Sequence, residues 1–126
     1  MTDHAQAEAF ARDWVECWNR HDIPGVLAHF ADDVVFTSPG AARLVPATGG
    51  IVRGKAALAD YWERALRGLP DLRFTLVGVY SGIDVVVINY RNQRGQLVNE
   101  VLRFDDGLVV EGHGVYQPID GAGASG

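Results

Sequence analysis

The second half of the chain constrains the fold most, because four apolar runs follow one another there with only short polar turns between them. The runs span residues 72–80, 83–91, 97–104 and 108–117, separated by Ser81-Gly82, Gln93-Arg94-Gly95 and Asp105-Asp106-Gly107. Turns this short join antiparallel neighbours in a sheet. We therefore predict that this half folds as a meander of four β-strands.

The first half shows the residue spacing of helices. Apolar side chains recur at intervals of three and four over residues 7–18 and again over residues 55–67, so each segment is predicted to form an amphipathic helix. Asp22 can cap a second, short helix, which Asp32 and Asp33 are predicted to end. Residues 34–38 are predicted to form a short strand, and residues 40–53, with proline, glycine and no clear period, a long loop bordering a site.

Helices followed by strands predict an α+β fold, in which three N-terminal helices pack on one face of a mixed or antiparallel sheet. Because the sheet must curl around the helices, we predict a cone-shaped, curved sheet that encloses a pocket. A length of 126 residues corresponds to one domain, which we assign to residues 1–120. Residues 121–126 have no apolar anchor and are predicted to be a flexible tail.

Charge and composition exclude several classes of partner. With a formal net charge of −5 and no long apolar run, the chain is not expected to bind nucleic acid or a membrane. The first residues lack the pattern of a signal peptide, so a cytoplasmic protein is expected, and the excess of arginine over lysine suggests a bacterial gene. Cys17, the single cysteine, is expected to be a buried hydrophobe. No metal-ligand spacing or cofactor motif is found, so neither metal nor cofactor is predicted.

The last predicted strand contains two glycines whose position needs an explanation. Gly112 and Gly114 share one face of the segment VVEGHGVY, residues 109–116, and glycine weakens a strand unless the space of its side chain is needed. We predict that both glycines border the pocket and that Tyr116 follows them on the same face. Alternation places His113 on the opposite, outer face, whereas a reversed strand register would turn His113 and Glu111 toward the pocket, and the sequence leaves this choice open.

Glu100 is the strongest candidate for acid–base chemistry, because apolar residues surround it in its predicted strand. A carboxyl group buried in a cavity has a raised pKa that suits proton transfer. The alternatives are an ion pair with Arg91 or Arg103, or exposure on the outer face of the sheet. Asn89 or Tyr90, on the preceding strand, is expected to share the cavity with Glu100, and the sequence leaves open which of them does so.

Four short motifs give the chain a family resemblance. WNRHD at residues 18–22, FADDVVF at 30–36, RGKAAL at 53–58 and FDDGLV at 104–109 follow the order and spacing of the nuclear transport factor 2-like superfamily. From about residue 5 to residue 118, the chain resembles in particular the SnoaL-like members of this superfamily. The resemblance implies a conical pocket between a concave sheet and the helices, often with dimerisation through the outer sheet face.

The same resemblance gives expectations for the site, although the superfamily includes ketosteroid isomerase, polyketide cyclases, epoxide hydrolases, dehydratases and binding domains. It implies that Glu100 replaces the oxyanion-binding aspartic acid of ketosteroid isomerase, whereas Trp14 and Ser38 replace its tyrosine and its base. In SnoaL-like cyclases the inward positions of the last strand carry a His-x-Asp pair, and here these positions are Gly112 and Gly114. The Asp-Arg-Asp arrangement of the epoxide hydrolases is not matched either.

We predict a pocket for a small hydrophobic compound, carbonyl-bearing or polyketide-like, and a proton-transfer reaction without a cofactor, such as isomerisation, cyclisation or dehydration. The alternative is a non-catalytic binding or interaction domain that has kept the cavity. A homodimer is expected from the resemblance. The predicted catalytic residues are Glu100 and Tyr116, and the predicted substrate-binding residues are Trp14, Ser38, Leu58, Trp62, Asn89, Tyr90, Leu102, Gly112 and Gly114.

Overall fold

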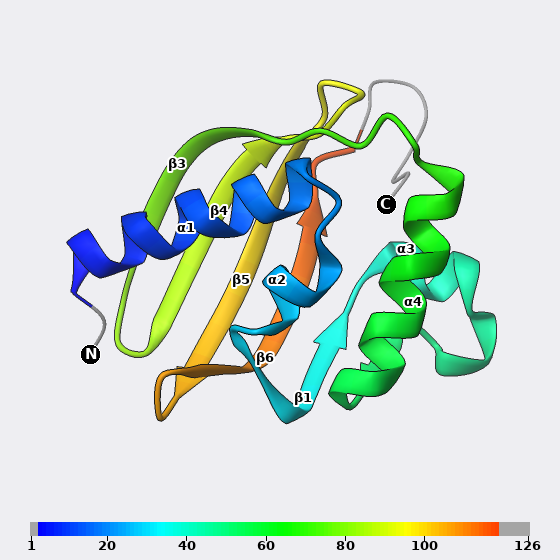
Figure 1. Cartoon of the computed structure of the whole chain (residues 1–126), viewed down its shortest axis with the longest axis horizontal. Helices are drawn as coiled ribbons and strands as arrows, with labels where there is room; N and C mark the ends of the chain where they lie inside the picture. The colour runs from blue at the N-terminus through cyan, green and yellow to red at the C-terminus, as the bar shows by residue number, and fades with distance from the viewer. Residues whose placement is uncertain (1–2, 119–126) are drawn as a thin grey trace.

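The computed structural model of the chain describes residues 3–118, and in it all described helices lie before residue 69, in the first part of the chain (Figure 1). In chain order the elements are α1 (His4–Asn19), α2 (Ile23–Leu27), β1 (Phe30–Thr37), α3 (Pro39–Leu44), the 3₁₀ helix η1 (Pro46–Thr48), β2 (Ile51–Arg53), α4 (Lys55–Gly68), β3 (Thr75–Ser81), β4 (Val85–Arg91), β5 (Leu97–Asp105) and β6 (Leu108–Tyr116). The predicted tail, residues 121–126, lies outside the described residues.

The six strands form one mixed sheet in the order β2-β1-β6-β5-β4-β3. Strands β3 to β6 are antiparallel neighbours, which confirms the predicted meander. β1 runs parallel to β6, and the short β2 pairs with β1 in the antiparallel sense and forms one edge. The predicted α+β class with a mixed sheet is therefore confirmed.

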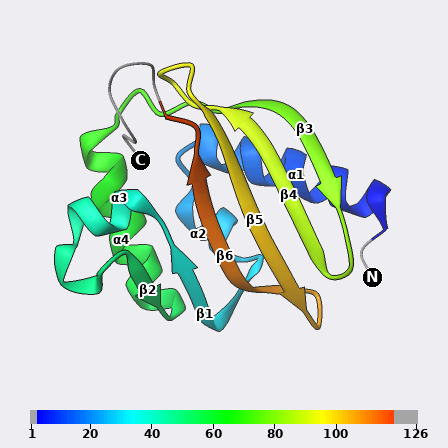
Figure 2. The ribbon, with the colours of Figure 1, turned by 180° about the vertical axis from the view of Figure 1, so that it is seen from behind.

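The helices cover one face of this sheet. α1 lies across β3 and β4, and α4 lies next to β1 (Figure 1). Seen from behind, the strands lie in front and none of the drawn helices covers them (Figure 2). The core lies between the helices and the inner sheet face, where Ala11, Trp14, Val26, Leu58, Trp62, Ile88 and Leu102 are buried. Within residues 3–118, no helix has the length and apolar character needed to cross a membrane.

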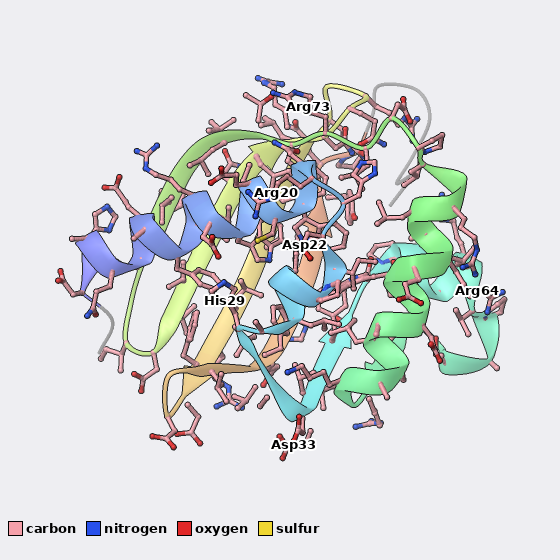
Figure 3. The ribbon with its side chains drawn as sticks, viewed as in Figure 1. Arg20, Asp22, His29, Asp33, Arg64 and Arg73 are labelled. Atoms are coloured by element: carbon pink, nitrogen blue, oxygen red, sulfur yellow. The ribbon has the colours of Figure 1, made fainter. Side chains whose placement is uncertain are left out.

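Side-chain hydrogen bonds fix the ends of the first two helices. Asp3 accepts a hydrogen bond from the amide of Ala5 at 3.2 Å, and Asp22, the predicted cap, accepts one from the amide of Gly25 at 3.0 Å. Asp22 lies at the connection between α1 and α2 (Figure 3). At the end of α1, the Asn19 side chain donates to the carbonyl of Phe74 at 2.9 Å and accepts from its amide at 2.7 Å. These two bonds hold Phe74 against α1.

The start of β1 differs from the prediction. α2 ends at Leu27, so Asp32 and Asp33 do not end a helix but lie within β1. They are exposed, whereas Phe30 and Val34 on either side are buried. The pairing of β1 with β6 is irregular at this point, so the burial pattern lacks the simple alternation by which a strand is recognised.

The segment predicted as a long loop, residues 40–53, contains most of α3 together with η1 and β2. Ser38 begins α3 by accepting a hydrogen bond from the amide of Gly40 at 3.1 Å, and Pro39 follows in the first turn, where a backbone amide has no helical partner. Each of the three elements has six residues or fewer, too few to show a period in the sequence. The described residues therefore contain four α-helices, one more than predicted.

A β-bulge in β6 decides which residues of the last strand face inward. Arg103 pairs with Glu111 and Phe104 pairs with Val109, so Val110 is an extra residue in β6. Because of this extra residue, Val109 and Gly112 are both buried although they would lie on opposite faces of a regular strand.

Candidate active site

A pocket of about 350 Å³ lies between the inner sheet face and the helices α1, α3 and α4. Its wall is mostly aromatic, and exposed Arg43, Leu44 and Leu69 lie at its rim. A pocket of this size and composition suits a small, flat, apolar ligand. The aromatic side chains that line it are Trp14, Trp18, Phe30, Phe36, Tyr61, Trp62, Phe74, Tyr90 and Tyr116.

The aromatic rings of the wall pack against one another. Trp14 stacks on Phe74 with ring centroids 5.7 Å apart, and Trp18 contacts Trp62 edge to face at 4.9 Å. Tyr90 lies 4.2 Å from Phe74 between ring centroids. Since large rings in mutual contact have few alternative rotamers, these contacts fix the shape of the wall.

Glu100 lies in the middle of β5, opposite Ile88 in β4 and Gly114 in β6. It is only 6% exposed and lines the pocket. Burial raises the pKa of the Glu100 carboxyl to about 8, although the hydrogen bond from Tyr90 acts in the opposite direction. The hydroxyl of Tyr90 donates this bond to Oε1 of Glu100 at 2.9 Å. At neutral pH the carboxyl is therefore mostly protonated.

Gly114 leaves the space around which the polar groups of the site gather. A β-carbon at this position would lie 3.6 Å from Oε1 of Glu100, 3.6 Å from Oγ of Ser38 and 3.4 Å from Cε1 of Tyr116. The predicted residues Glu100, Ser38 and Tyr116 thus lie around Gly114, and of these four residues Glu100 and Tyr116 line the pocket whereas Ser38 and Gly114 do not. Tyr61 also reaches this region, because its hydroxyl is hydrogen-bonded to the side chain of Ser38.

The phenols of Tyr61, Tyr90 and Tyr116 keep their protons at neutral pH. Burial is the main cause that raises the pKa of each phenol, and the charge of ionised Glu100 acts in the same direction. Hydrogen bonding to Ser38 and the positive charge of Arg43 lower the pKa of Tyr61 and Tyr116 but do not outweigh burial. The site therefore combines a neutral carboxyl with neutral hydroxyl groups, which suits a carbonyl or hydroxyl oxygen of a ligand.

Gly112 borders packed core instead of the pocket. A β-carbon there would lie 3.0 Å from Cδ2 of Leu102 and 3.0 Å from Cδ1 of Phe36. Leu102 and Leu58 are fully buried and are not among the residues that line the pocket. The structure thus differs from the prediction for Gly112, Leu58 and Leu102, because neighbouring side chains fill the space next to them.

The register of β4 against β5 decides between Asn89 and Tyr90. Tyr90 pairs with Val98 and lines the pocket, whereas Asn89 pairs with Asn99 on the outer face. The Asn89 amide donates to Oδ1 of Asn99 at 2.9 Å and to the carbonyl of Val98 at 3.1 Å. The structure therefore corrects the inclusion of Asn89 among the pocket residues, since adjacent residues of a strand face opposite sides.

The two arginines considered as partners of Glu100 interact elsewhere. Arg91 donates to the carbonyl of Gly95 at 3.1 Å, and Nε of Arg103 donates to Oε1 of Glu111 at 3.2 Å. Within residues 3–118, no three His, Cys, Asp or Glu side chains are grouped so as to hold a metal ion. The predicted residues that line the pocket are Trp14, Trp62, Tyr90, Glu100 and Tyr116.

His113 lies on the outer face of the sheet within a row of polar side chains. Its Nε2 lies 2.7 Å from Oε2 of Glu111, and its Nδ1 lies 2.6 Å from Oγ1 of Thr37. His113 is thus separated from the pocket by the sheet itself.

Some pocket residues were not predicted from the sequence. Arg43 and Leu44 belong to α3, in the segment predicted as a loop, and no pattern there indicates their direction. Leu72 and Phe74 lie just before β3, in an irregular segment. Tyr61 is different, because the apolar spacing of α4 already places it on the inward stripe of that helix.

Comparison with known protein families identifies the family of the chain. Residues 11–117 match the SnoaL-like domain family, and the chain belongs to this family. No curated protein matches it. The match covers every described helix and strand except the first turns of α1.

Solved structures share the fold. A SnoaL-like protein of unknown function from Burkholderia thailandensis is 36% identical, with a TM-score of 0.87 over 93% of this chain and 99% of that one. AclR from Streptomyces galilaeus, described as a proposed hydroxylase, is 25% identical, with a TM-score of 0.70 over 91% of each chain. TerC, co-crystallised with polyporic acid, is 17% identical, with a TM-score of 0.72 over 88% of this chain and 91% of that one.

Proposed function

We propose that this protein is an enzyme that moves protons on a small hydrophobic, carbonyl-bearing compound without a cofactor, in an isomerisation, cyclisation or dehydration. One observation supports the proposal most: the Glu100 carboxyl is buried in an aromatic pocket and has a pKa of about 8. A carboxyl that titrates near the working pH can both donate and accept a proton.

The proposed step needs only the two oxygens of the Glu100 carboxyl. In the neutral carboxyl, one oxygen gives its proton to the carbonyl oxygen of the substrate, and the other takes a proton from the adjacent carbon. The carbonyl becomes an enol, and the carboxyl is protonated again. In the second half of the reaction, the carboxyl gives its proton to a different carbon while its other oxygen takes back the proton of the enol. The carbonyl forms again, the isomerisation is complete, and no oxidant is consumed.

The neighbouring phenols have supporting roles in this proposal. Tyr90 holds the carboxyl through its hydrogen bond to Oε1 of Glu100. Tyr116 lies near Glu100 and Ser38 and is proposed to orient the substrate oxygen through its hydroxyl. The similarity to AclR supports an enzymatic role in general, whereas the assignment of proton transfer rests on Glu100 and these phenols.

The substitution E100Q tests the proposal. Glutamine keeps the size of the side chain but cannot exchange the transferred proton, so turnover of a carbonyl substrate found by screening should fall by about 10²–10⁴-fold. Ligand affinity, measured by calorimetry, should change little. E111Q makes the same change on the outer face and is the matched control, with full turnover expected.

Full turnover by E100Q would refute the assignment of Glu100. If the pocket binds carbonyl compounds that the wild-type protein does not convert, the second candidate, a non-catalytic binding domain, is the better description. The absence of the His-x-Asp pair, whose positions are Gly112 and Gly114, is the observation that favours this second candidate.

The pH dependence of turnover provides a separate readout. Because the proposed reaction starts from the neutral carboxyl, the rate should be highest below pH 8 and should fall as the pH rises through the pKa of about 8. Initial rates at saturating substrate across this range measure the effect. A rate that increases through pH 8 would contradict the proposed starting form.

We also propose that the protein forms a homodimer through the outer sheet face. Within the described part of the chain no helix covers this face (Figure 2), and Tyr80 and Val115 are exposed there. Light scattering at micromolar concentration should give twice the mass of one chain. A monomer under these conditions would refute the dimer.

A further inference from the structure

We propose that the ligand of this pocket carries an anionic group, and that this group binds in a side extension of the pocket next to Arg43 and Arg94. The inference rests on the proposed function in one respect, because it takes the aromatic pocket to be the substrate site. It specifies the class of substrate as a flat apolar carbonyl compound with a carboxylate or a similar anion at one end.

The extension is a hollow of about 210 Å³ that continues from the aromatic pocket. Pocket and extension share six lining residues, so the two hollows adjoin each other. The shared residues are Arg43, Leu69, Leu72, Phe74, Tyr90 and Tyr116. Beyond them, the extension is lined by polar side chains from the turn between β4 and β5, namely Asn92, Gln93, Arg94 and Gln96.

The charges around pocket and extension contrast with those of the whole chain. The sequence contains 16 Asp and Glu residues and a net charge of −5, yet Glu100 is the one acidic residue among the described residues that line the two hollows. The other charged lining residues are Arg43, Arg64 and Arg94. Since the Glu100 carboxyl is mostly neutral at pH 7, the local charge is positive.

Arg43 and Arg94 are the arginines that both geometry and charge place near the extension. The pKa of Tyr61 and of Tyr116 is raised by burial, and the positive charge of Arg43 opposes this rise at both, so its field reaches these two residues of the pocket wall. Arg64 lines only the aromatic pocket, and its side chain lies on the flank of α4 away from the sheet (Figure 3). We therefore assign the anion contact to Arg43 and Arg94.

The turn that carries Arg94 is held in shape by its own side chains. Oδ1 of Asn92 accepts hydrogen bonds from the amides of Arg94 and Gln96, each at 3.0 Å. The side-chain amide of Gln96 donates to the carbonyl of Gln117 at 2.8 Å, which ties the turn to the end of β6. Arg94 is thus presented from a fixed backbone, and a guanidinium in a fixed position can bind a carboxylate or sulfonate through two parallel hydrogen bonds.

A matched pair of fluorescent probes tests the inference. Toluidinonaphthalene sulfonate is flat and apolar with a sulfonate at one end, and its parent amine has the same rings without the sulfonate. The sulfonate should bind about fivefold to tenfold more tightly than the parent amine, a modest factor because the arginines are exposed. Added salt should reduce this preference.

Single arginine substitutions locate the anion contact. R43Q and R94Q should each remove a large part of the preference for the sulfonate, while R43K should keep most of it. R73Q is the matched control, because Arg73 is exposed, does not line either hollow and points away from the helices (Figure 3). It should bind both probes as the wild type does.

Equal affinity for the two probes, or no binding of either, would overturn the inference. An equal loss for both probes in R43Q and R94Q would also overturn it, because it would indicate apolar packing by the arginine stems. The proposed function fails by a different result, namely full turnover by E100Q. E100Q should keep the preference for the sulfonate, so the two failures are distinguishable.

Discussion

Glu100 and Glu111 lie on neighbouring strands of one sheet, but the environment shifts the pKa of their carboxyl groups in opposite directions. Glu100 faces the pocket, where burial raises its pKa to about 8. Glu111 faces outward, where hydrogen bonds from His113 and Arg103 lower its pKa. At neutral pH the first carboxyl is mostly protonated and the second is ionised.

The difference shows what the inner face contributes to the proposed chemistry. Glu111 has cationic or potentially cationic donors at 2.7 Å and 3.2 Å, whereas the one hydrogen bond described for Glu100 comes from a neutral phenol. A phenol holds the carboxyl in place but stabilises its ionised form less than a guanidinium does. The pocket thus positions Glu100 and leaves it able to carry a proton.

The largest expected consequence of the difference between Glu100 and Glu111 is a change in how the free energy of unfolding depends on pH. The pKa of Glu100 is raised in the folded state, so between about pH 4.5 and pH 8 the folded protein binds more protons than the unfolded chain. The contribution of Glu100 to the free energy of unfolding therefore falls as the pH rises through this range. E100Q should be more stable than the wild type by about 3 kcal/mol at pH 7 and equally stable near pH 4.

Urea unfolding at a series of pH values measures this effect, and E111Q is the control. The pKa of Glu111 is lowered in the folded state, so its contribution has the opposite sign, is present at neutral pH and is lost on acidification. E111Q should therefore be slightly less stable than the wild type at pH 7. Parallel stability curves for the wild type and E100Q would contradict the raised pKa.

A smaller effect on the free energy of unfolding is expected from alanine substitutions at the two glycines of β6, which test how tightly the inner face is packed at each position. G112A places a β-carbon 3.0 Å from Leu102 and Phe36, both buried, and should lower the free energy of unfolding by about 1 kcal/mol. G114A places it at 3.4 Å or more from its neighbours, so stability should change by less than about 0.5 kcal/mol. Thermal unfolding of the two variants measures the difference, and equal losses would show that both positions are packed alike.

The smallest expected effect is a shift in two titrations. Y90F removes the hydrogen bond that lowers the pKa of Glu100, so this pKa should rise further above its ordinary value. R103Q removes a hydrogen bond that lowers the pKa of Glu111, so this pKa should also rise, but toward its ordinary value. Carbon NMR of the two carboxyl groups measures both, and a fall in either pKa would contradict the assigned cause.

The parts of the structure that were predictable depend on local pattern. β5 has nine residues that alternate clearly, and this alternation predicts the inward direction of Glu100. The apolar stripes of α1 and α4 likewise place Trp14 and Trp62 on the inner side of their helices. In each case the period of one long element decides the direction of the side chain.

The parts that were not predictable depend on contacts between distant segments. The space next to Gly112 is filled by Phe36 from β1, and no local pattern in β6 indicates that contact. Whether Asn89 or Tyr90 faces the pocket depends on the register of β4 against β5. The turn that joins these strands is held by hydrogen bonds between Asn92 and Gln96. The burial of Phe30 depends on its pairing with Val109.

The parallel contact between β1 and β6 also determines when the pocket forms during synthesis. Thr37 and His113, 76 residues apart in sequence, lie side by side in the sheet. β6 joins β1 to β5 and supplies Tyr116 to the wall. On the ribosome, the tryptophans of α1 and α4 are therefore made long before β6, the strand that joins β1 to β5 and completes the wall.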